Sequence, residues 1–510
     1  MAFSDSYVGL LQKIPGIANP IKKLTFKDKL KWTGLILLVY FLMSQISIYG
    51  ISQTSFEYFQ YLEILLGSKF GSLVTLGIGP IVTASILLQL LVGSKIINWN
   101  LREEKGKMMF QGTQKLLAIF LAFFEAIIFV SLGAIPAAPG MGLIVILQLA
   151  AGGIIILFMD EVISKWGFGS GVGLFIVAGV ASTIMVRTFN PLTALGAWPT
   201  PGDPSVGAIP NAIISVSGGQ MINAFLALLP VIATLLVFLL VVYAQAVRVE
   251  IPLAFGSVRG FGRRWPLKFF YTSNIPVILI AALLANVQMF ARMLAQGGSS
   301  WLGTFDADGN AIGGLIFYFI PPRNPAIAGF MVSIGLFVLL GLVLMYFSKK
   351  GNWKIGLIFG AIGGFIWWFF MMSSGQTALA TITGSELVRM GTYSLLMVVG
   401  AVIFSKFWMI TAGMDSKAVA EQIQSTGMQI PGFRRDIRII ERVLQRYVPA
   451  LAVLGGAAVG ALAAYADFTL ALGTGTGILL AAIIIYQLYE EIAMQHMEDM
   501  HPAVRRILGK

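Results

Sequence analysis

Few side chains in this sequence are of the kinds that carry nucleophilic, redox or metal chemistry. There is no cysteine, which excludes disulfides, thiolate catalysis and cysteine-based metal sites. The two histidines, His496 and His501, lie close to the C-terminal end, so none is left for a buried relay or a metal centre. The sequence therefore predicts a protein that is not an enzyme and that holds no metal and no cofactor.

One acidic residue, Glu125, stands in the middle of an apolar run, IFLAFFEAIIFV. Ion-coupled transporters usually keep paired or chained ionisable residues inside the helix bundle. A lone Glu gives thin support for a proton pathway, and it fits equally well a neutral, hydrogen-bonded acid at a helix–helix contact. By contrast, Asp160, Glu161, Glu490 and Glu491 lie near the ends of their apolar runs, where water is close.

Two glycine-rich stretches have the look of ligand-binding loops. GFGSGVG (167–173) has the spacing of a dinucleotide loop, but it follows an apolar helix rather than a strand, so this match is false. GTGTG (473–477) indicates close helix packing or a flexible entry to the last apolar run. Neither stretch adds a chemical function.

The elements that must position these residues are membrane-spanning helices. The chain is 57% hydrophobic and 11% charged, whereas a soluble domain carries about a quarter charged residues. A spanning helix needs roughly 20 apolar residues. Twelve suitable runs occur, at about 32–50, 74–92, 112–134, 141–162, 172–189, 220–247, 270–294, 326–348, 354–373, 387–412, 447–466 and 470–490.

The basic residues give an independent test of these twelve spans, because Lys and Arg collect on the cytoplasmic side. An even number of spans puts both chain ends on one side of the membrane. With both termini in the cytoplasm of a multi-pass cell-membrane protein, only a few of the 35 Lys and Arg fall on the other side. They are Lys69, Arg187, Arg292, Arg323 and Arg389.

The choice between Lys and Arg carries further information. The N-terminal segment uses only Lys, which suits a segment lying on an anionic lipid leaflet. The loops 248–268 and 413–446 are rich in Arg, whose planar guanidinium binds phosphates and stacks on bases. Composition alone leaves two interpretations of these loops open. They are either RNA-docking tips or carriers of the ordinary positive charge that sets membrane topology.

The run TLGIGPIVTASILLQLL (75–91) begins with the helix breakers Gly77, Gly79 and Pro80. Irregular backbone at membrane depth survives only where protein or a water-filled cavity surrounds it. This start is therefore predicted to face inward, and the amphipathic run at about 58–70 reads as a short half-helix folded into the same cavity.

Aliphatic residues recur at helical spacing beside such irregularities. Each singly fits lipid contact or core packing, but their shared placement favours a common ring. A ring of aliphatic side chains would form a constriction that dewets and blocks ions while giving a passing chain no polar grip. Its candidate members are Ile78, Val82, Val172, Ile176, Ile278 and Leu480.

Four long stretches resemble the SecY family of protein-conducting channels in its archaeal form. They are TLGIGPIVTASILLQLLVGSKII, RVEIPLAFGSVRG, KFFYTSNIPVILIAALLANV and GTGTGILLAAIIIYQLYEE, and the similarity covers nearly the whole chain. The resemblance implies an all-α polytopic membrane protein with ten core helices in two inverted halves, about 1–190 and 215–491, closing as a clamshell around a pore. It also implies passive conduction of unfolded secretory polypeptides and lateral release of hydrophobic segments into lipid.

The same resemblance assigns roles to residues. The six aliphatics match the family's pore ring, and Thr83, Glu125 and Asn286 match polar positions of its lateral gate, which a signal sequence opens. The half-helix at about 58–70 matches the plug, with Tyr61, Leu62, Ile64, Leu65 and Leu66. Ribosome contacts through ribosomal RNA are implied for Arg259, Arg263, Arg264, Arg434 and Arg435.

Further partners implied by the resemblance are two small membrane subunits of the SecE/γ and β types, and nascent polypeptides with their signal sequences. The sequence departs from ten helices by an inserted pair at about 326–373, which we expect on the periphery, facing lipid. A tail at 492–510 is expected in the cytoplasm.

Two other classes of function remain as alternatives. A secondary transporter shares inverted repeats and a broken helix, but it predicts a polar midplane site. A membrane scaffold or ribosome receptor without conduction leaves the plug and the aliphatic ring unexplained.

Overall fold

The fold is taken from a computed structural model of the chain. The residues it describes are 7–9, 11, 13–22, 24–51, 69, 71–99, 101, 103–131, 135–193, 197–200, 204–255, 262–272, 274–296, 300–306, 311–348, 353–373, 382–425, 428–429 and 437–499.

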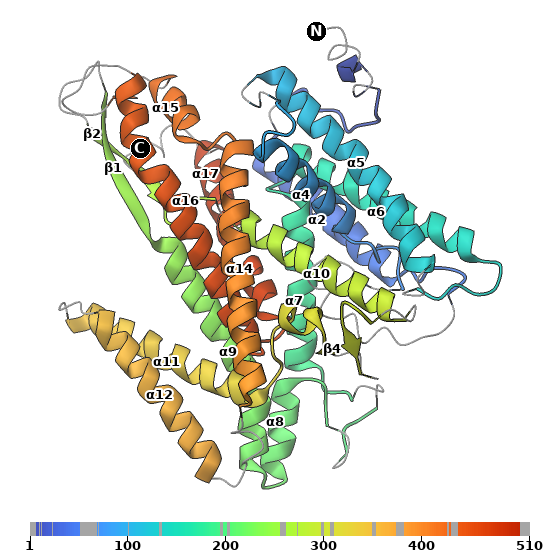
Figure 1. The fold of residues 1–510 in the computed structure, drawn as a ribbon, viewed down its shortest axis with the longest axis vertical. Coiled ribbons are helices and arrows are strands. Elements are labelled where there is room, and N and C mark those ends of the chain that lie inside the picture. The colour runs from blue at the N-terminus through green and yellow to red at the C-terminus, as the bar shows by residue number, and fades with distance from the viewer. Residues whose placement is uncertain are drawn as a thin grey trace.

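A helix lies over each of the twelve predicted apolar runs, so the polytopic α-helical prediction is confirmed (Figure 1). Eight of the helices in the described part of the chain are long and apolar enough to cross a membrane. The twelve are α2 (Phe26–Gln45), α4 (Gly79–Gly93), α5 (Glu104–Ser131), α6 (Gly142–Trp166), α7 (Gly171–Phe189), α9 (Met221–Ala246), α10 (Ile275–Gln296), α11 (Pro325–Ser348), α12 (Trp353–Ser373), α14 (Gly384–Thr411), α16 (Ile437–Phe468) and α17 (Gly475–Asp499).

The helices pack in two groups that meet along α7 and α17. In the first group α5 packs between α4 and α6, and α2 lies on α6. In the second, α14 packs on α16 and α10, and α17 on α9 and α16. The largest buried cluster of hydrophobic side chains draws on both groups, so the core of the molecule lies where they meet.

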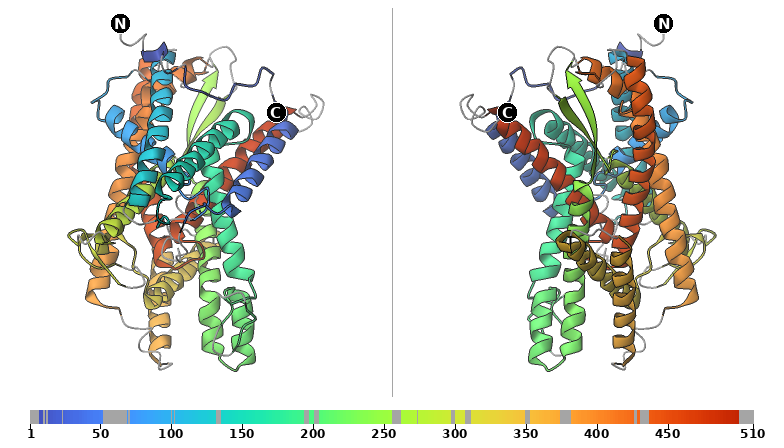
Figure 2. Two further views of the ribbon diagram at one scale, coloured as in Figure 1. Left: turned by 90° about the vertical axis from the view of Figure 1, so that its right-hand side faces the viewer. Right: turned by 90° about the vertical axis from the view of Figure 1, so that its left-hand side faces the viewer.

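The region 248–268 is a β-hairpin and not the irregular loop that the sequence suggested. Strands β1 (Arg248–Phe255) and β2 (Gly262–Lys268) pair antiparallel, and β5 (Met428–Gln429) adds to β1. The ribbon stands at one end of the molecule, opposite the short helix α8 (Ala208–Ser217) (Figure 2). A small second sheet joins β3 (Thr304–Phe305) to β4 (Ala311–Gly313), ahead of the 3-10 helix η2 (Leu315–Phe319).

The segment 413–446 is also more regular than expected. It contains the helix α15 (Ser416–Ser425), and α16 begins at Ile437, well before its apolar run. The early turns of α16 bury Ile440 and Leu444 and expose Arg442. This part of the predicted loop is therefore an amphipathic extension of the helix. Tyr271, just beyond β2, donates its hydroxyl to the Met414 carbonyl at 2.7 Å.

The backbone before α4 is irregular and buried, as the sequence predicted. Residues 71–78 form successive turns, with Gly71 and Gly77 at positive φ. These turns lie against α6, where a Cβ added to Gly152 would stand 1.8 Å from the Leu73 carbonyl oxygen. The Leu73 N–H donates to the Ile46 carbonyl at the end of α2. Protein therefore surrounds the break on at least two sides.

The inserted pair lies at the periphery. Helices α11 and α12 pack on each other, and α11 contacts α9 and α16. Glycines allow the close approach, because a Cβ at Gly329 would lie 2.0 Å from the Trp367 ring. The Trp367 ring of α12 lies 5.8 Å from the Phe225 ring of α9. Phe365 and Phe369 on α12 are about 60% exposed, as a lipid-facing helix requires.

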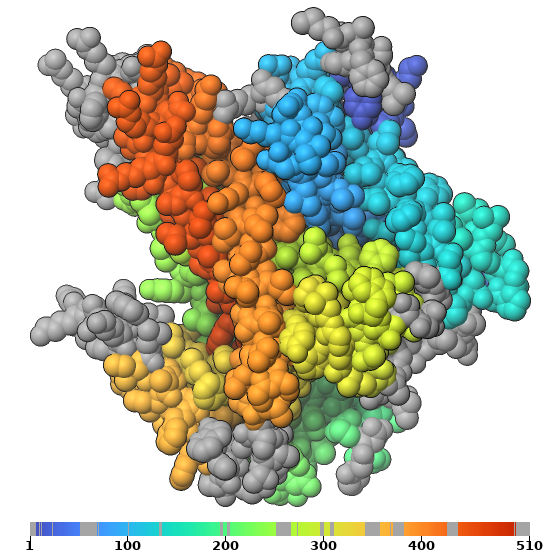
Figure 3. All heavy atoms as spheres, in the orientation of Figure 1, coloured from blue at the N-terminus to red at the C-terminus, as the bar shows by residue number. Residues whose placement is uncertain are grey.

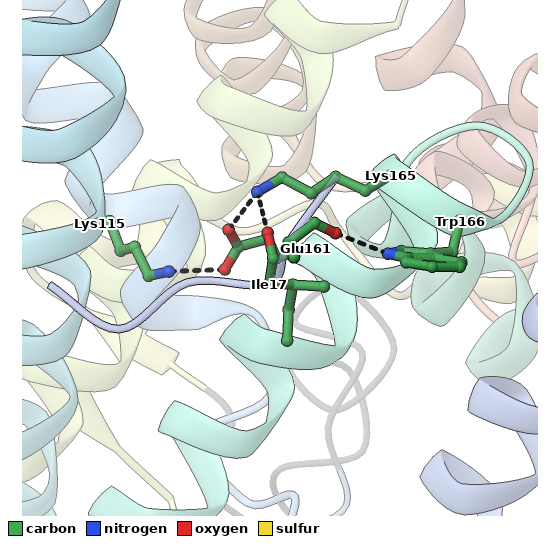
Figure 4. Close-up of polar contacts among 6 residues, drawn as sticks. Ile17, Lys115, Glu161, Lys165 and Trp166 are labelled. Carbon is green, nitrogen blue, oxygen red and sulfur yellow. Dashed lines mark hydrogen bonds and ion pairs between the residues drawn. The ribbon is translucent and has the colours of Figure 1, made fainter. Parts of the chain in front are cut away.

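The N-terminal segment is fastened to the end of α6 (Figure 4). Lys165 donates to the Ile17 carbonyl at 2.5 Å and the Trp166 indole to the Ala18 carbonyl at 2.9 Å. Glu161 pairs with Lys165 at 2.8 Å and with Lys115 of α5 at 2.6 Å. Glu161, near the end of α6, therefore links α5 to α6 next to the N-terminal segment.

Candidate functional site

The six aliphatic candidates belong to the buried cluster at the meeting of the two helix groups. Ile176 and Leu480 are at most 1% exposed, and only Val172 is half-buried, packing against the others. They come from α4, α7, α10 and α17. In each helix they occupy the first two turns or the residue just before them. Four helix beginnings thus supply one apolar cluster.

The local sequence explains why these helices begin there. Pro80 and Pro276 are the second residues of α4 and α10, a position where the missing N–H of proline costs nothing. Val82 and Ile278 follow each proline by two residues. Helices α7 and α17 begin instead at Gly171 and Gly475.

A cavity of about 330 Å³ ends at this cluster. Val82, Val172 and Ile278 line it, whereas Ile78, Ile176 and Leu480 do not. The remaining lining is partly polar, and it includes Ser85, Gln114, Asp160, Asn274, Gln487 and Glu491. Most of the lining is nevertheless apolar, and this cavity is called the vestibule.

The three polar candidates Thr83, Glu125 and Asn286 are brought together. The Asn286 amide donates to the Thr83 hydroxyl at 3.1 Å, which joins α10 to α4. The Glu125 carboxyl of α5 lies within hydrogen-bonding reach of the same hydroxyl and is 6% exposed. This polar contact among three helices is called the seam. It agrees with a hydrogen-bonded acid at a helix contact, one of the two interpretations left open for Glu125.

The face in Figure 3 shows how the two groups border each other. Orange side chains of α14 adjoin the blue ones of the α4–α5 region and the yellow-green ones of α10 and the segment that follows it. Contacts of α14 with α4 and of α10 with α4 bridge the groups. The seam lies on the helices that make these bridging contacts.

Gln89 and Asp467 are among the buried polar residues that the sequence analysis did not single out. Gln89 of α4 is fully buried, and its amide donates to the Ser85 hydroxyl at 2.9 Å. Asp467 is buried near the end of α16 and accepts from Tyr393 at 2.7 Å. The only signal for Asp467 was its place in ADF, just before GTGTG, at the margin of two apolar runs.

Other predicted residues lie wholly or partly outside the described part. The proposed plug residues Tyr61, Leu62, Ile64, Leu65 and Leu66 are outside it, as are Arg259, Arg434 and Arg435. Arg263 and Arg264 fall on β2, opposite Leu253 and Pro252 of β1. Among the described residues, no group of three or more His, Cys, Asp or Glu is placed to hold a metal ion.

These observations define a polytopic helical membrane protein with a buried aliphatic cluster where its two helix groups meet and a cavity beside that cluster. Comparisons with known proteins identify its family. The family model SecY matches residues 72–489, and the model for the plug domain of Sec61p matches residues 38–71. The protein translocase subunit SecY of Methanothermobacter thermautotrophicus is 41% identical, with 99% of each chain covered.

Solved structures agree. One described as the structure of a protein conducting channel has a TM-score of 0.76 and 37% identity, covering 98% of this chain and 99% of the other. Sec61 in the canine ribosome-channel complex has a TM-score of 0.73 and 37% identity, with the same coverage. The chain belongs to the SecY family, a family of translocation channel subunits that are not enzymes.

Proposed function

We propose that this chain is the central pore-forming subunit of a Sec protein translocation channel in the cell membrane. The observation that carries the proposal is a vestibule that ends on aliphatic side chains from four helices of both groups. Such a floor dewets when empty and offers no polar grip to an unfolded chain. The family relatives named as protein translocase subunits support the same function.

In this proposal Ile78, Val82, Val172, Ile176, Ile278 and Leu480 form the pore ring. A secondary transporter would instead need polar ligands for a solute at this depth. The buried cluster at these positions is aliphatic, which speaks against a transporter. A membrane scaffold that does not conduct would leave both the vestibule and the constriction without a function.

The seam of Thr83, Glu125 and Asn286 acts as the lateral gate. Interhelical polar contacts in membranes are worth about 0.5–2 kcal/mol each. Burying one apolar side chain of a signal helix contributes about 1.5–3 kcal/mol. A signal helix inserted between α4 and α10 thus outweighs the hydrogen bonds that it replaces, and the gap then opens toward lipid.

The plug is proposed at about 58–70, between the end of α2 and the buried turns before α4. Its support is the plug-domain model, which matches residues 38–71. The turns at 71–78 that follow this segment pack against α6 and hydrogen-bond the end of α2, and they lead into Ile78.

The halves of the clamshell are proposed at 1–190 and 215–491, with the pair 326–373 inserted in the second. This division follows the two packing groups that meet along α7 and α17. Both termini, including the tail 492–510, are proposed to be cytoplasmic because the Lys and Arg collect there.

The ribosome is the proposed partner at the hairpin β1–β2 and the segment before α16, through Arg259, Arg263, Arg264, Arg434 and Arg435. The support is the similarity to Sec61 in a ribosome-channel complex. Small membrane subunits of the SecE/γ and β types complete the assembly in this proposal, and the membrane lipid receives released segments.

Cysteine crosslinking tests conduction, because the chain has no cysteine of its own. Ile78→Cys at the ring and Tyr61→Cys at the plug are each paired with a stalled translocating polypeptide that carries one cysteine. We expect a signal-dependent disulfide at position 78. Ile362→Cys on α12, 47% exposed and away from the ring, serves as the matched control.

Crosslinking at position 362 equal to that at 78 would contradict passage through the ring. Failure at both 61 and 78, together with accumulation of a small solute in vesicles, would replace the channel with the transporter.

A further inference from the structure

Helices α7 and α17 begin with the same short motif, Gly-Ser/Thr-Gly-x-Gly. The stretches are GSGVG (169–173) and GTGTG (473–477). Gly169 and Gly473 both adopt positive φ, at 68° and 73°. In both stretches the second glycine is the first residue of the helix. The two motifs share these features, although the residue before each helix differs, because Ser170 is extended at a φ of −108° and Thr474 has a φ of 65°.

A carboxylate from the preceding helix satisfies the first N–H groups of α7. The Val172 N–H donates to Asp160 Oδ1 at 2.9 Å. The Gly171 N–H and the Ser170 hydroxyl also hydrogen-bond this carboxylate. The first N–H groups of a helix have no partner within the helix, so Asp160 of α6 supplies what α7 lacks.

Asp467 of α16 does the same for α17. The Thr476 N–H donates to Asp467 Oδ1 at 2.7 Å, and the Gly475 N–H also bonds this carboxylate. The hydroxyls of Thr476 and Tyr393 both donate to Oδ2. The first and second N–H groups of each helix thus meet one carboxylate from the helix before it.

The glycines at the helix starts permit this contact. A Cβ at Gly171 would lie 2.5 Å from the Asp160 Cα, and one at Gly475 would lie 1.8 Å from the Ala466 carbonyl carbon. Both positions face the backbone of the helix that carries the acid, and backbone cannot move aside as a flexible side chain can. Any side chain at either position would separate the carboxylate from the N–H groups.

The two beginnings lie at opposite ends of an antiparallel helix pair. Added Cβ atoms show the register: Gly169 lies near Leu488, Gly173 near Ile484, and Gly473 near Ile184. Ile176 and Leu480 hold the same position in their motifs, six residues into each helix. With this register both fall at the middle of the pair, where α7 and α17 cross.

We infer that Asp160 and Asp467 are an equivalent pair of positioning residues that hold Ile176 and Leu480 at the constriction. Each carboxylate fixes the first turn of a helix whose second turn carries a ring residue. This inference rests on the pore ring of the proposed function. It also explains why α4 and α10 need no such acid, because Pro80 and Pro276 occupy their second positions and lack an N–H.

The test measures how fast thiols at the ring react with a membrane-impermeant reagent. Reporters Ile176→Cys and Leu480→Cys are made singly in the full-length chain and reconstituted in vesicles. Asp160→Asn or Asp467→Asn is then added, which replaces one carboxylate oxygen by an NH₂ group that cannot accept. We expect labelling to rise about tenfold. That factor corresponds to about 1.4 kcal/mol, within the range of about 0.5–1.5 kcal/mol for the net contribution of one hydrogen bond.

Glu441→Gln is the control, since Glu441 lies on α16 like Asp467 but accepts a hydrogen bond from Gln445 of the same helix. We expect its labelling to stay within about twofold of the parent, the scatter of surface substitutions. Tyr393→Phe removes one donor to Asp467 and leaves the N–H contacts. It should raise labelling in the same direction by less, and it replaces Asp467→Asn if that variant does not fold.

Three outcomes distinguish a failure of the positioning role of Asp160 and Asp467 from a failure of the pore ring. Unchanged labelling with lowered thermal stability would make both acids merely structural and overturn the positioning role. Ion leakage through Leu480→Ser with unchanged labelling in the Asp variants would also overturn that role but leave the ring intact. No leakage through Leu480→Ser would instead remove the ring and the proposed function itself.

Discussion

The constriction and the seam stand side by side on the same helices but are built from opposite chemistry. On α4 the ring residue Val82 directly precedes the seam residue Thr83, and α10 carries Ile278 and Asn286 two turns apart. The ring side chains meet without hydrogen bonds, whereas the seam depends on an amide, a hydroxyl and a carboxyl in fixed positions.

This difference in chemistry determines how each site responds to a passing polypeptide. Apolar contact is non-directional and roughly proportional to area, so an aliphatic ring can close around any passing sequence. Hydrogen bonds require distance and angle, so a seam made of them is either formed or broken. The first suits a seal and the second suits a switch.

The largest effect of mutation is expected where the start of α7 packs against Asp160. In Gly171→Ala the added methyl would stand 2.5 Å from the Asp160 Cα, so we expect a loss of about 3 kcal/mol in unfolding free energy. Gly179→Ala on the same helix meets nothing within 4 Å. It should be neutral or stabilising by up to about 1 kcal/mol. Thermal unfolding of both variants in detergent measures the contrast, and equal losses would contradict the close approach.

A polar residue in the ring should break the seal. We expect Leu480→Asn to raise ion leakage through reconstituted vesicles by about tenfold or more, because an amide at the floor admits water. Ile485→Asn on the same helix is the control, since Ile485 is 46% exposed and faces away. Leakage through both variants to the same extent would mean that the floor is not the seal.

Mutations in the seam should change channel opening by a smaller factor than a polar residue in the ring changes ion leakage. Thr83→Val and Asn286→Leu each remove the bond between α4 and α10. Either should let a weakened signal sequence open the channel about fivefold more often, since one such bond is worth about 1 kcal/mol. The double variant should add little, because both changes remove the same contact.

Thr411→Val on α14 is the control for the seam, since that hydroxyl bonds within its own helix. The measurement is the translocation rate of a reporter with a shortened signal. Fully additive effects of Thr83→Val and Asn286→Leu would show that the two side chains act separately.

The smallest effect is expected at Glu125. Glu125→Gln keeps an oxygen for the Thr83 hydroxyl, so translocation of the same reporter should change by less than about twofold. Glu125→Leu leaves that hydroxyl without its partner and should resemble Thr83→Val. A strong effect of Glu125→Gln alone would point to a role for the charge and revive the proton pathway.

Much of the fold could be predicted because its signals are local. Apolar runs predicted all twelve of these helices, and Gly77 and Pro80 predicted the buried break before α4. The hairpin β1–β2 and the early start of α16 were missed, because polar strands and amphipathic turns lack the long apolar pattern of a span.

The candidate site divides in the same way. The clustering of the six aliphatic residues was predicted from their spacing beside Gly and Pro, and their role as a pore ring stays a prediction. The seam was assigned only through the resemblance to SecY. Nothing in the sequence near Thr83 indicates that Asn286, on another helix far along the chain, will reach its hydroxyl.

The sequence by itself determined which segments form the long apolar helices and which ends carry charge, since periodicity, helix breakers and composition act over a few neighbouring residues. Only the tertiary structure decided that Asp160 and Asp467 bond the starts of α7 and α17, and that three polar side chains share one seam. Those contacts depend on how helices cross. Crossing is set by packing over the whole bundle, which no local pattern records.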